Sequence, residues 1–233
     1  MKKFLCILLI VALTTALLPT GVSASALSFS DVDPNAWYAP GISYVLESGL
    51  MKGVSSQHFA PHKAVTRSMM VTVLWRLAGS PKIDYEDLNS QNEYWILLDI
   101  PTGAYYETAA LWAKSTGIME GYSIPYDPEE PPTGLSAYTF RPDNVLTREQ
   151  LATVLYRYAT WAEKIGSVSA LTKDFPDSDT VSSWAREAMG YCIGAGLIQG
   201  TSHNGLAYLN PKGSTTRGQL ATILMRFADP ASP

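Results

Sequence analysis

Three stretches of the chain share one pattern of apolar positions. Each follows a Thr-Arg pair, at residues 66–67, 147–148 and 216–217, and its apolar residues recur at i, i+3, i+4 and i+7. They are Met70, Val73, Leu74 and Leu77, then Leu151, Val154, Leu155 and Tyr158, then Leu220, Ile223, Leu224 and Phe227. This spacing predicts three amphipathic helices, each with one buried stripe.

The residues at the start of these helices match helix-capping preferences. Threonine is a good N-cap because its hydroxyl accepts from a backbone N–H of the first turn. Gln150 and Gln219 complete capping boxes in the second and third copies, whereas Met69 leaves the first copy with its threonine alone.

Capping does not explain the arginines Arg67, Arg148 and Arg217. A cation in the first turn faces the positive end of the helix dipole, at a cost of about 0.3–1 kcal/mol when exposed. Its recurrence in three copies indicates a second role. Two interpretations remain open, namely bidentate binding of an anion beside unused helix N–H groups, or a salt bridge to a carboxylate within the fold.

A shorter helix is predicted before each Thr-Arg helix. It follows an acidic turn, which reads Phe29-Ser30-Asp31-Val32, Leu98-Asp99-Ile100-Pro101 or Phe175-Pro176-Asp177-Ser178. An aromatic residue comes six or seven positions after the aspartate, at Trp37, Tyr105 and Trp184. Small residues one turn later (Gly41, Ala109, Ala188) would let another helix approach closely.

Each short helix ends at a Gly-apolar-apolar-x-Gly segment, at residues 49–53, 117–121 and 196–200. The first glycine suits the left-handed position after a helix. The second, at Gly53, Gly121 and Gly200, is predicted to serve a turn with positive φ, and the alternative is close approach of another group. A loop then ends in Phe59-Ala60-Pro61, Phe140-Arg141-Pro142 or Leu209-Asn210-Pro211.

The repetition predicts an all-α protein of three helix-loop-helix units. The first unit spans residues 27–80, the second 98–160 and the third 175–233, with linkers at 81–97 and 161–174 that Trp95, Trp161 and Ile165 suggest are partly packed. The second unit contains an insertion at 122–139, rich in Pro, Gly and acidic residues, which is predicted to be a surface excursion.

The N-terminus reads as a secretory signal peptide. Lys2 and Lys3 precede an apolar run, and Ala24-Ser25-Ala26 suits cleavage after residue 26. No later segment is apolar enough to span a membrane. Cys6 leaves with the signal, so Cys192 is expected to be a small buried residue without a disulfide partner. The net charge of −4 argues against nucleic acid as a partner.

Acidic turn, aromatic-led helix, Gly-apolar-apolar-x-Gly, Phe-x-Pro loop and Thr-Arg helix together resemble the S-layer homology motif, in three copies from Phe29 to Phe227. The resemblance implies a pseudo-threefold, three-pronged helical spindle. Its grooves would bind the secondary cell-wall polysaccharide that is attached to peptidoglycan in Gram-positive-type bacteria, often through pyruvylated N-acetylmannosamine. The family's arginine contact falls on the three Thr-Arg arginines.

The chain departs from the family pattern at several positions. The family's Thr-Arg-Ala-Glu glutamate is Met69, Gln150 and Gln219 here, and its alanine is Ser68, Glu149 and Gly218. The second unit has Tyr105 in place of Trp, and its turn is interpreted as starting with Leu98 in place of Phe. These changes leave open whether the three grooves bind the polysaccharide equally well.

Twelve residues are candidates for ligand binding: Arg67, Arg148, Arg217, Asp31, Asp99, Asp177, Trp37, Tyr105, Trp184, Gly53, Gly121 and Gly200. The aromatics could stack on a sugar face, although filling the helix interface is the favoured interpretation. The aspartates could hold the sugar, cap their own helix region or pair with the arginines, and a structural role is favoured.

The predicted function is a secreted, non-catalytic module that anchors at the bacterial cell wall. The alternative is a structural or protein-interaction subunit of the envelope, with another envelope protein as partner. Acidic pairs such as Asp31/Asp33 and Asp177/Asp179 lie in the repeated turn, where a structural role suffices, so catalysis is not expected. No cofactor is expected, and His58, His62 and His203 lie in predicted loops that do not suggest a metal site.

Overall fold

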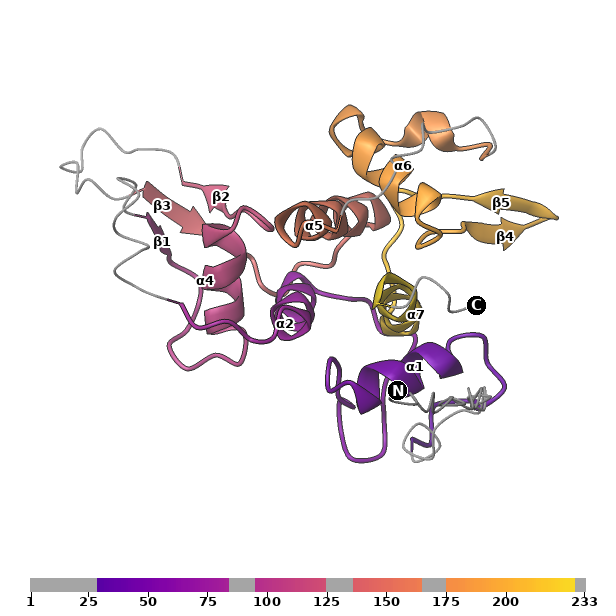
Figure 1. The fold of residues 1–233 in the computed structure, drawn as a ribbon, viewed down its shortest axis with the longest axis horizontal. Helices are drawn as coiled ribbons and strands as arrows, with labels where there is room; N and C mark the ends of the chain where they lie inside the picture. The colour runs from indigo at the N-terminus through magenta and orange to yellow at the C-terminus, as the bar shows by residue number, and fades with distance from the viewer. Residues whose placement is uncertain (1–28, 84–94, 125–135, 165–174, 229–233) are drawn as a thin grey trace, which may run out of the picture.

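The computed structural model describes residues 29–83, 95–124, 136–164 and 175–228 (Figure 1). The predicted signal peptide and much of both linkers and of the insertion lie outside these residues. The described part is mostly helical. Its helices are α1 (Ala39–Glu47), α2 (Arg67–Leu77), α4 (Glu107–Ser115), α5 (Arg148–Trp161), α6 (Arg186–Gly194) and α7 (Arg217–Ala228), with 3-10 turns η2 (Ser178–Thr180) and η3 (Ser183–Ala185) before α6.

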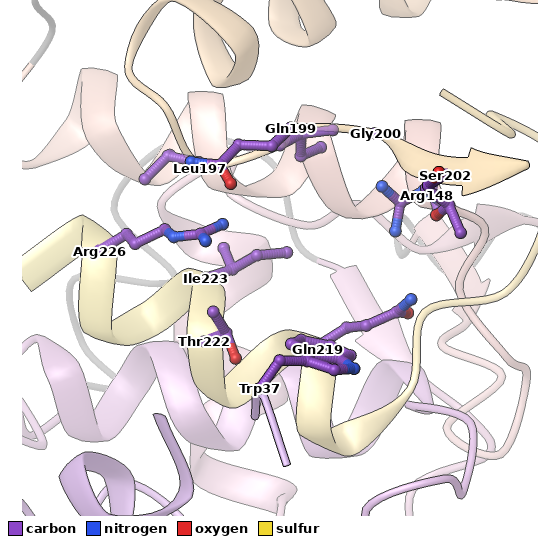
Figure 2. Close-up of a pocket in the computed structure, with 12 residues that line it drawn as sticks. Trp37, Arg148, Leu197, Gln199, Gly200, Ser202, Gln219, Thr222, Ile223 and Arg226 are labelled. Carbon is purple, nitrogen blue, oxygen red and sulfur yellow. The ribbon is translucent and has the colours of Figure 1, made fainter. Parts of the chain in front are cut away.

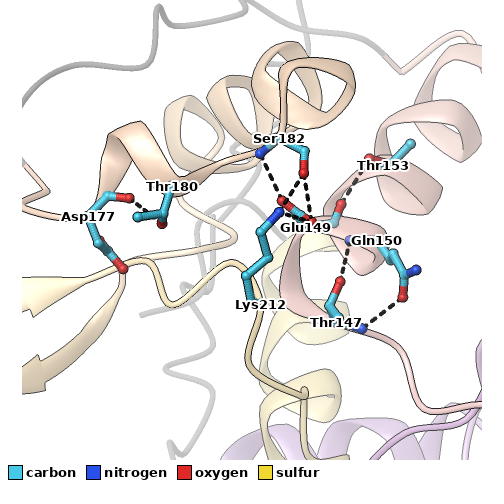
Figure 3. A network of polar contacts seen from close by, with 8 residues as sticks. All are labelled: Thr147, Glu149, Gln150, Thr153, Asp177, Thr180, Ser182 and Lys212. Carbon is cyan, nitrogen blue, oxygen red and sulfur yellow. Dashed lines mark hydrogen bonds and ion pairs between the residues drawn. The ribbon is translucent and has the colours of Figure 1, made fainter.

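The predicted caps of the Thr-Arg helices α2, α5 and α7 are confirmed. Thr66 accepts from the Met69 backbone N–H at 3.4 Å. Thr147 forms a complete capping box with Gln150 (Figure 3). Thr216 accepts from the Gln219 N–H at 3.3 Å and donates its own N–H to the Gln219 side chain at 2.9 Å. Sequence alone therefore fixes where these helices begin.

The helices pack in pairs that join different units. α1 packs on α7, α4 on α2 and α6 on α5. Each Thr-Arg helix thus pairs with the short helix of the following unit, and the third unit returns to the first. Figure 1 shows α2, α5 and α7 in the middle of the molecule, with α1, α4 and α6 outside them. This cyclic pairing means that no unit buries its apolar stripes alone.

The segments just before the Thr-Arg helices meet at the centre of this arrangement. The Val65 N–H donates to the Thr215 carbonyl at 2.8 Å, the Thr215 N–H to the Leu146 carbonyl at 3.4 Å, and the Leu146 N–H to the Val65 carbonyl at 3.0 Å. These three bonds form a closed cycle in which each unit contributes one donor and one acceptor. Val65, Thr215 and Leu146 are at most 1% exposed.

Two small sheets accompany the helices, so the all-α prediction is wrong. β3 (Ser136–Thr139) pairs in parallel with β1 (Trp95–Leu97) and antiparallel with β2 (Tyr122–Ser123). β4 (Thr201–His203) and β5 (Leu206–Tyr208) form a hairpin. These strands have two to four residues, too few to show a period-two pattern.

The described ends of the predicted insertion are therefore part of a sheet. β2 and β3 lie at the two ends of residues 122–139, and β1 supplies the third strand from the end of the preceding linker. Trp161, which was assigned to the second linker, is the last residue of α5. The linker boundaries remain predictions, but the structure shows β1 at the end of the first linker and the last residue of α5 at the start of the second.

Cys192 is buried in α6, as predicted. It is fully buried, and its Sγ lies 3.8 Å from the Ala152 carbonyl oxygen of α5. Burial raises the pKa of the thiol to about 12, which makes the thiolate scarce at neutral pH. The residue acts as a small apolar group in the α5–α6 contact.

The close approach predicted at the small residues is clearest at Gly41 in α1. A Cβ at this position would lie 2.6 Å from the Thr222 backbone nitrogen and 2.7 Å from the Thr222 Cα of α7. Both neighbours are backbone atoms of a packed helix, so they cannot rotate away. Glycine is required here for the contact that closes the first unit on the third.

We predict that Gly41→Ala destabilises the protein although alanine favours helix. The added methyl group would separate α1 from α7, at a cost of about 1–3 kcal/mol, offset by about 1 kcal/mol of helix propensity. Urea denaturation should show a net loss, while the exposed Glu47→Ala in the same helix should stay within about 0.5 kcal/mol of wild type. A Gly41→Ala protein as stable as the control would contradict the close packing.

Candidate functional site

The three Thr-Arg arginines are buried and point into the neighbouring unit. Arg67, Arg148 and Arg217 are 6–7% exposed. Arg67 Nε donates to the Phe140 carbonyl at 2.7 Å and Arg148 Nε to the Leu209 carbonyl at 2.7 Å. Arg217 Nε donates to the Phe59 carbonyl at 2.9 Å. Each arginine therefore holds the Phe-x-Pro loop, or its Leu-Asn-Pro equivalent, of the next unit.

A second bond is made by two of the three guanidinium groups. Arg67 Nη2 donates to the Glu120 carbonyl and Arg217 Nη2 to the Lys52 carbonyl, both at 2.6 Å. These carbonyls immediately precede Gly121 and Gly53. Within the described residues Arg148 makes its hydrogen bond through Nε alone. The three sites thus share one design but differ in how many arginine donors are occupied.

The helix N–H groups beside the arginines are not free. The Arg67 N–H donates to the Asn144 carbonyl at 2.9 Å and the Ser68 N–H to the Pro142 carbonyl at 2.9 Å. In α5 the N–H groups of residues 148 and 149 donate to the carbonyls of residues 213 and 211. In α7 those of residues 217 and 218 donate to the carbonyls of residues 63 and 61. The argument for an anion at unused helix donors is therefore wrong, because the neighbouring loop already caps each helix.

The alternative, a direct salt bridge to a carboxylate, is also not what the described residues show. The ion pairs among them are Lys114–Glu120 and Lys212–Glu149. Burial lowers the pKa of each Thr-Arg guanidinium, and a nearby aspartate raises it in part at all three sites. At Arg67, Tyr122 raises the pKa more than the aspartate does. Arginine nevertheless keeps its charge at neutral pH. Each site therefore contains a buried cation bound to carbonyl groups.

The aspartates of the acidic turns hold the other side of the same loops. Both carboxylate oxygens of Asp31 accept backbone N–H groups, from Phe59 at 2.8 Å and Ala60 at 2.7 Å. Asp99 and Asp177 make equivalent pairs of bonds to residues 140–141 and 209–210, at 2.6–2.9 Å. The favoured structural role thus has a definite form, in which the aspartate binds the loop N–H groups and the arginine binds the carbonyl.

The aromatics of the short helices are exposed, so the favoured assignment of these residues to the core is wrong. Trp37 is 63% exposed, Tyr105 65% and Trp184 56%. The neighbouring Tyr38 is buried in place of Trp37. The Tyr105 hydroxyl donates to Ser68 Oγ at 3.3 Å. An exposed indole beside a pocket is available for contact with a ligand.

Trp37 lines a pocket that we call the Arg148 pocket (Figure 2). Its volume is about 380 Å³. Residues from all three units line it, among them Trp37, Arg148, Gly200, Gln219, Thr222 and Arg226. Because the first unit supplies Trp37 and the second Arg148, the pocket exists only when the cyclic pairing is complete.

A second pocket, which we call the Arg67 pocket, repeats this composition. It has a volume of about 210 Å³ and is lined by residues that include Trp184, Arg67, Gly121, Gln150, Thr153 and Arg157. Taken in this order, the six residues are equivalent by position in the repeat to the six named for the Arg148 pocket. Tyr122 lies over the Arg67 guanidinium, 5.0 Å from Cζ to the ring centre, and narrows this pocket.

The second glycines are required by close contacts rather than by a shared turn. A Cβ at Gly53 would lie 2.6 Å from the Ser55 carbonyl oxygen, and one at Gly121 would lie 2.9 Å from Tyr138 Cβ. Gly200 alone of the three has a positive φ, +80°, and its Cβ would lie 2.9 Å from Phe175. The turn prediction is therefore confirmed at Gly200 and wrong at Gly53 and Gly121.

The contacts at these glycines also correct the alignment of the second acidic turn. Phe29 approaches Gly53, Phe175 approaches Gly200, and Leu97 approaches Gly121. Leu97 is 7% exposed, whereas Leu98 is 58% exposed. The residue equivalent to the two phenylalanines is therefore Leu97, two positions before Asp99, and not Leu98.

Sequence reasoning missed several pocket residues. Gln150 and Gln219 were assigned only to capping, and Arg157, Arg226, Thr153 and Thr222 were not singled out. A pattern for them existed, because an arginine recurs nine residues after each Thr-Arg arginine, at Arg76, Arg157 and Arg226. Two and a half turns place it on the opposite side of the helix from the Thr-Arg arginine, on the side that carries the glutamine seven residues before it and the threonine four residues before it.

Glu149 forms a local network in place of the family's alanine (Figure 3). It is 4% exposed and pairs with Lys212 at 2.6 Å. It also accepts from the Ser182 N–H at 3.0 Å and hydroxyl at 3.1 Å. Lys212 lies in the loop before α7 and Ser182 before α6. The network therefore links the second unit to the third at the residue that follows Arg148.

No group of three or more His, Cys, Asp or Glu side chains in the described residues is arranged to hold a metal ion. Among the same residues, no helix has both the length and the apolar character needed to cross a membrane.

Comparison with known proteins identifies the repeated segments. The sequence profile of the S-layer homology domain matches residues 28–68 and 174–221. Two segments of the chain thus match the S-layer homology domain. Both matched segments contain an acidic turn and one of the exposed tryptophans, and they lie at opposite ends of the described chain.

Several longer proteins are similar to this chain. An endoglucanase of Bacillus sp. (strain KSM-635) is 27% identical over 230 residues, covering 96% of this chain and 22% of the relative. The surface-layer 125 kDa protein of Lysinibacillus sphaericus is 27% identical over 205 residues, covering 87% and 15%. The S-layer protein sap of Bacillus anthracis is 24% identical over 205 residues, covering 88% and 22%.

The chain therefore spans about a fifth of the length of these relatives. Their names range from S-layer proteins to an endoglucanase, and the matched part of each is about as long as this chain. The domain and the S-layer relatives indicate a module that anchors at the bacterial cell surface or wall.

We predict that Asp31→Asn weakens the fold, because an amide offers one acceptor oxygen to the two loop N–H groups. The expected loss is about 1–3 kcal/mol in urea denaturation. Asp33→Asn is the matched control, since Asp33 is exposed and accepts a single N–H, from Asn35. Equal stability of the two variants would contradict the role of Asp31.

We also predict that Asp31→Asn changes how the stability of the fold depends on pH. Burial raises the pKa of Asp31, but the bonds from Phe59 and Ala60 outweigh it, so the pKa lies below 3.8. The charged form therefore stabilises the fold above about pH 4, and this contribution is lost as the pH falls through the folded value. Acid titration of stability should show a weaker decline in Asp31→Asn than in wild type.

Proposed function

We propose that this chain is a non-catalytic module that binds an anionic cell-wall polysaccharide in the pockets between its units. The observation that carries the proposal is the repeated composition of the two pockets. Each combines an exposed indole, a buried arginine from a second unit, and a glutamine, a threonine and a further arginine from a Thr-Arg helix. Aromatic faces with guanidinium groups suit an acidic sugar.

Local charge supports an anionic ligand although the protein is acidic overall. The net charge of −4 would repel an anionic polymer at long range. Two arginines nevertheless line each described pocket, in a partly buried setting where charge-assisted hydrogen bonds are strong. We therefore propose recognition through short-range contacts, with a pyruvylated sugar of the secondary cell-wall polymer as the ligand.

The ligand-binding candidates divide into two groups in this proposal. Trp37, Trp184 and the arginines Arg67 and Arg148 contact the sugar, since all four line a pocket. Asp31, Asp99 and Asp177 shape the pockets indirectly through the loops, and the second glycines give the chain room to approach. Tyr105, Arg217 and Gly53 would serve a third pocket, in which Met69 replaces the glutamine.

We further propose that all three units are S-layer homology motifs arranged as a pseudo-threefold, three-pronged spindle. The cyclic helix pairing and the equivalent arginine and aspartate bonds in the second unit support a middle motif between the two matched segments. Export by the predicted signal peptide to the wall of a Gram-positive-type bacterium belongs to the same proposal.

A wall-binding assay tests the function directly. The protein is mixed with purified sacculi before and after chemical removal of the secondary polymer. Binding should disappear with the polymer. Equal binding to stripped peptidoglycan would overturn polymer recognition, and capture that depends on another envelope protein would favour the structural or protein-interaction alternative.

We predict that Trp37→Ala and Trp184→Ala each weaken polymer binding about tenfold while leaving stability within about 0.5 kcal/mol. Both side chains are largely exposed, so their removal leaves the core intact, whereas a stacked aromatic commonly contributes more than 1 kcal/mol to binding. Leu206→Ala is the control, because Leu206 is 53% exposed on β5 and lies outside both pockets. Unchanged binding in both tryptophan variants would contradict the proposed sites.

The tryptophans are better probes than the arginines. Arg67→Ala or Arg217→Ala would leave two carbonyl groups without their donor, so lost binding could reflect lost folding.

A further inference from the structure

The Arg148 pocket contains two guanidinium groups with unused donors. Arg148 bonds within the described residues through Nε, so both of its terminal nitrogens remain available. Arg226 Nε is shielded from solvent and has no hydrogen-bond partner there. Figure 2 shows the two side chains extending towards each other from opposite sides of the pocket. Because Nε is shielded, a ligand in the pocket would meet the Arg226 guanidinium through its terminal nitrogens.

The equivalents of Arg226 in the other units are not free in this way. Arg76 Nη1 donates to the Leu50 carbonyl at 3.0 Å, which fixes its guanidinium on the protein. Arg157 lines the Arg67 pocket but is exposed, so water can solvate it. Arg226 is half-buried and retains an unpaired donor. The repeated arginine thus has three different environments, of which one is unsatisfied.

The lining of the Arg148 pocket contains no aspartate or glutamate, whereas Glu120 lines the Arg67 pocket. Asp177 is near enough to Arg148 to favour its charged form, but it lies outside the lining and both of its carboxylate oxygens accept loop N–H groups. The Arg148 pocket is the larger of the two, at about 380 Å³ against 210 Å³. Two like charges facing one partly desolvated space repel each other, and a ligand with two negative groups removes that repulsion.

We propose that the Arg148 pocket selects a sugar unit carrying two anionic groups, one bound by Arg148 and the other by Arg226. Arg226 is then the residue that determines this preference. The inference rests on the proposed function and adds a ligand class to one of its sites. The second anionic group is a carboxylate or a phosphate on the same or the adjoining sugar.

The test compares two defined probes by isothermal titration calorimetry with the full chain. One is the methyl glycoside of pyruvylated N-acetylmannosamine, with one carboxylate, and the other is its 1-phosphate, with two anionic groups. Wild type should bind the 1-phosphate at least tenfold more tightly. Arg226→Gln should reduce this ratio to about threefold or less, because it weakens binding of the 1-phosphate more than binding of the methyl glycoside.

Matched variants separate charge from folding. Arg157→Gln changes the exposed equivalent and should keep the wild-type ratio, and Arg226→Lys retains the charge and should keep most of the preference. Circular dichroism and thermal melting confirm that each variant is folded. A ratio that survives in Arg226→Gln, or an equal loss for both probes, would overturn the inference.

Failure of the inference can be told apart from failure of the proposed function. Equal binding of the two probes to wild type, with sacculus binding intact, overturns the two-anion preference alone. Absence of binding to both probes and to sacculi overturns both proposals. Inorganic phosphate serves as a further probe, and an affinity for it equal to that for the 1-phosphate would show a simple anion site and overturn selection of a sugar unit.

Discussion

The structure depends on one loop peptide in each unit being held from both sides. An aspartate of the same unit binds its N–H, and an arginine of the preceding unit binds its carbonyl. In the Phe59–Ala60 peptide, the Ala60 N–H donates to Asp31 and the Phe59 carbonyl accepts from Arg217. The opposite charges thus act through a polarised peptide group rather than through a direct ion pair. Since the arginine always comes from another unit, the interaction both shapes the loop and closes the cycle.

The pockets follow from this closure. The Arg148 pocket needs Trp37 from the first unit, Arg148 from the second and Gly200 from the third, so an isolated unit would lack it. The arginine has two duties, because its Nε supports the loop while its terminal nitrogens face the pocket to different extents. This division explains why one residue type recurs at a position that helix electrostatics disfavours, and why the pockets differ in the donors they leave available.

Sequence differences between the units become differences in pocket chemistry. Tyr122 covers Arg67 and narrows its pocket, whereas the corresponding segment at 201–202 leaves the Arg148 pocket wider. Glu149 replaces a small residue and fastens the third unit through Lys212 and Ser182. Units with the same helix pairing therefore support sites of unequal size and charge, as expected when function resides in the side chains grafted on a repeated fold.

The sequence alone determined the helices, their caps at Thr66 and Thr147, and the S-layer homology resemblance, because helical periodicity and capping are local properties. It also singled out the arginines and aspartates, but not their bonds, since each partner lies in another segment of the chain. It did not show that Trp37 is exposed while Tyr38 is buried, that Gly121 is needed for packing rather than for a turn, or that Arg226 shares a pocket with Arg148, because each depends on contacts between distant segments. The short strands were equally inaccessible, because pairing between segments far apart in the chain, and not any pattern within two to four residues, makes them strands.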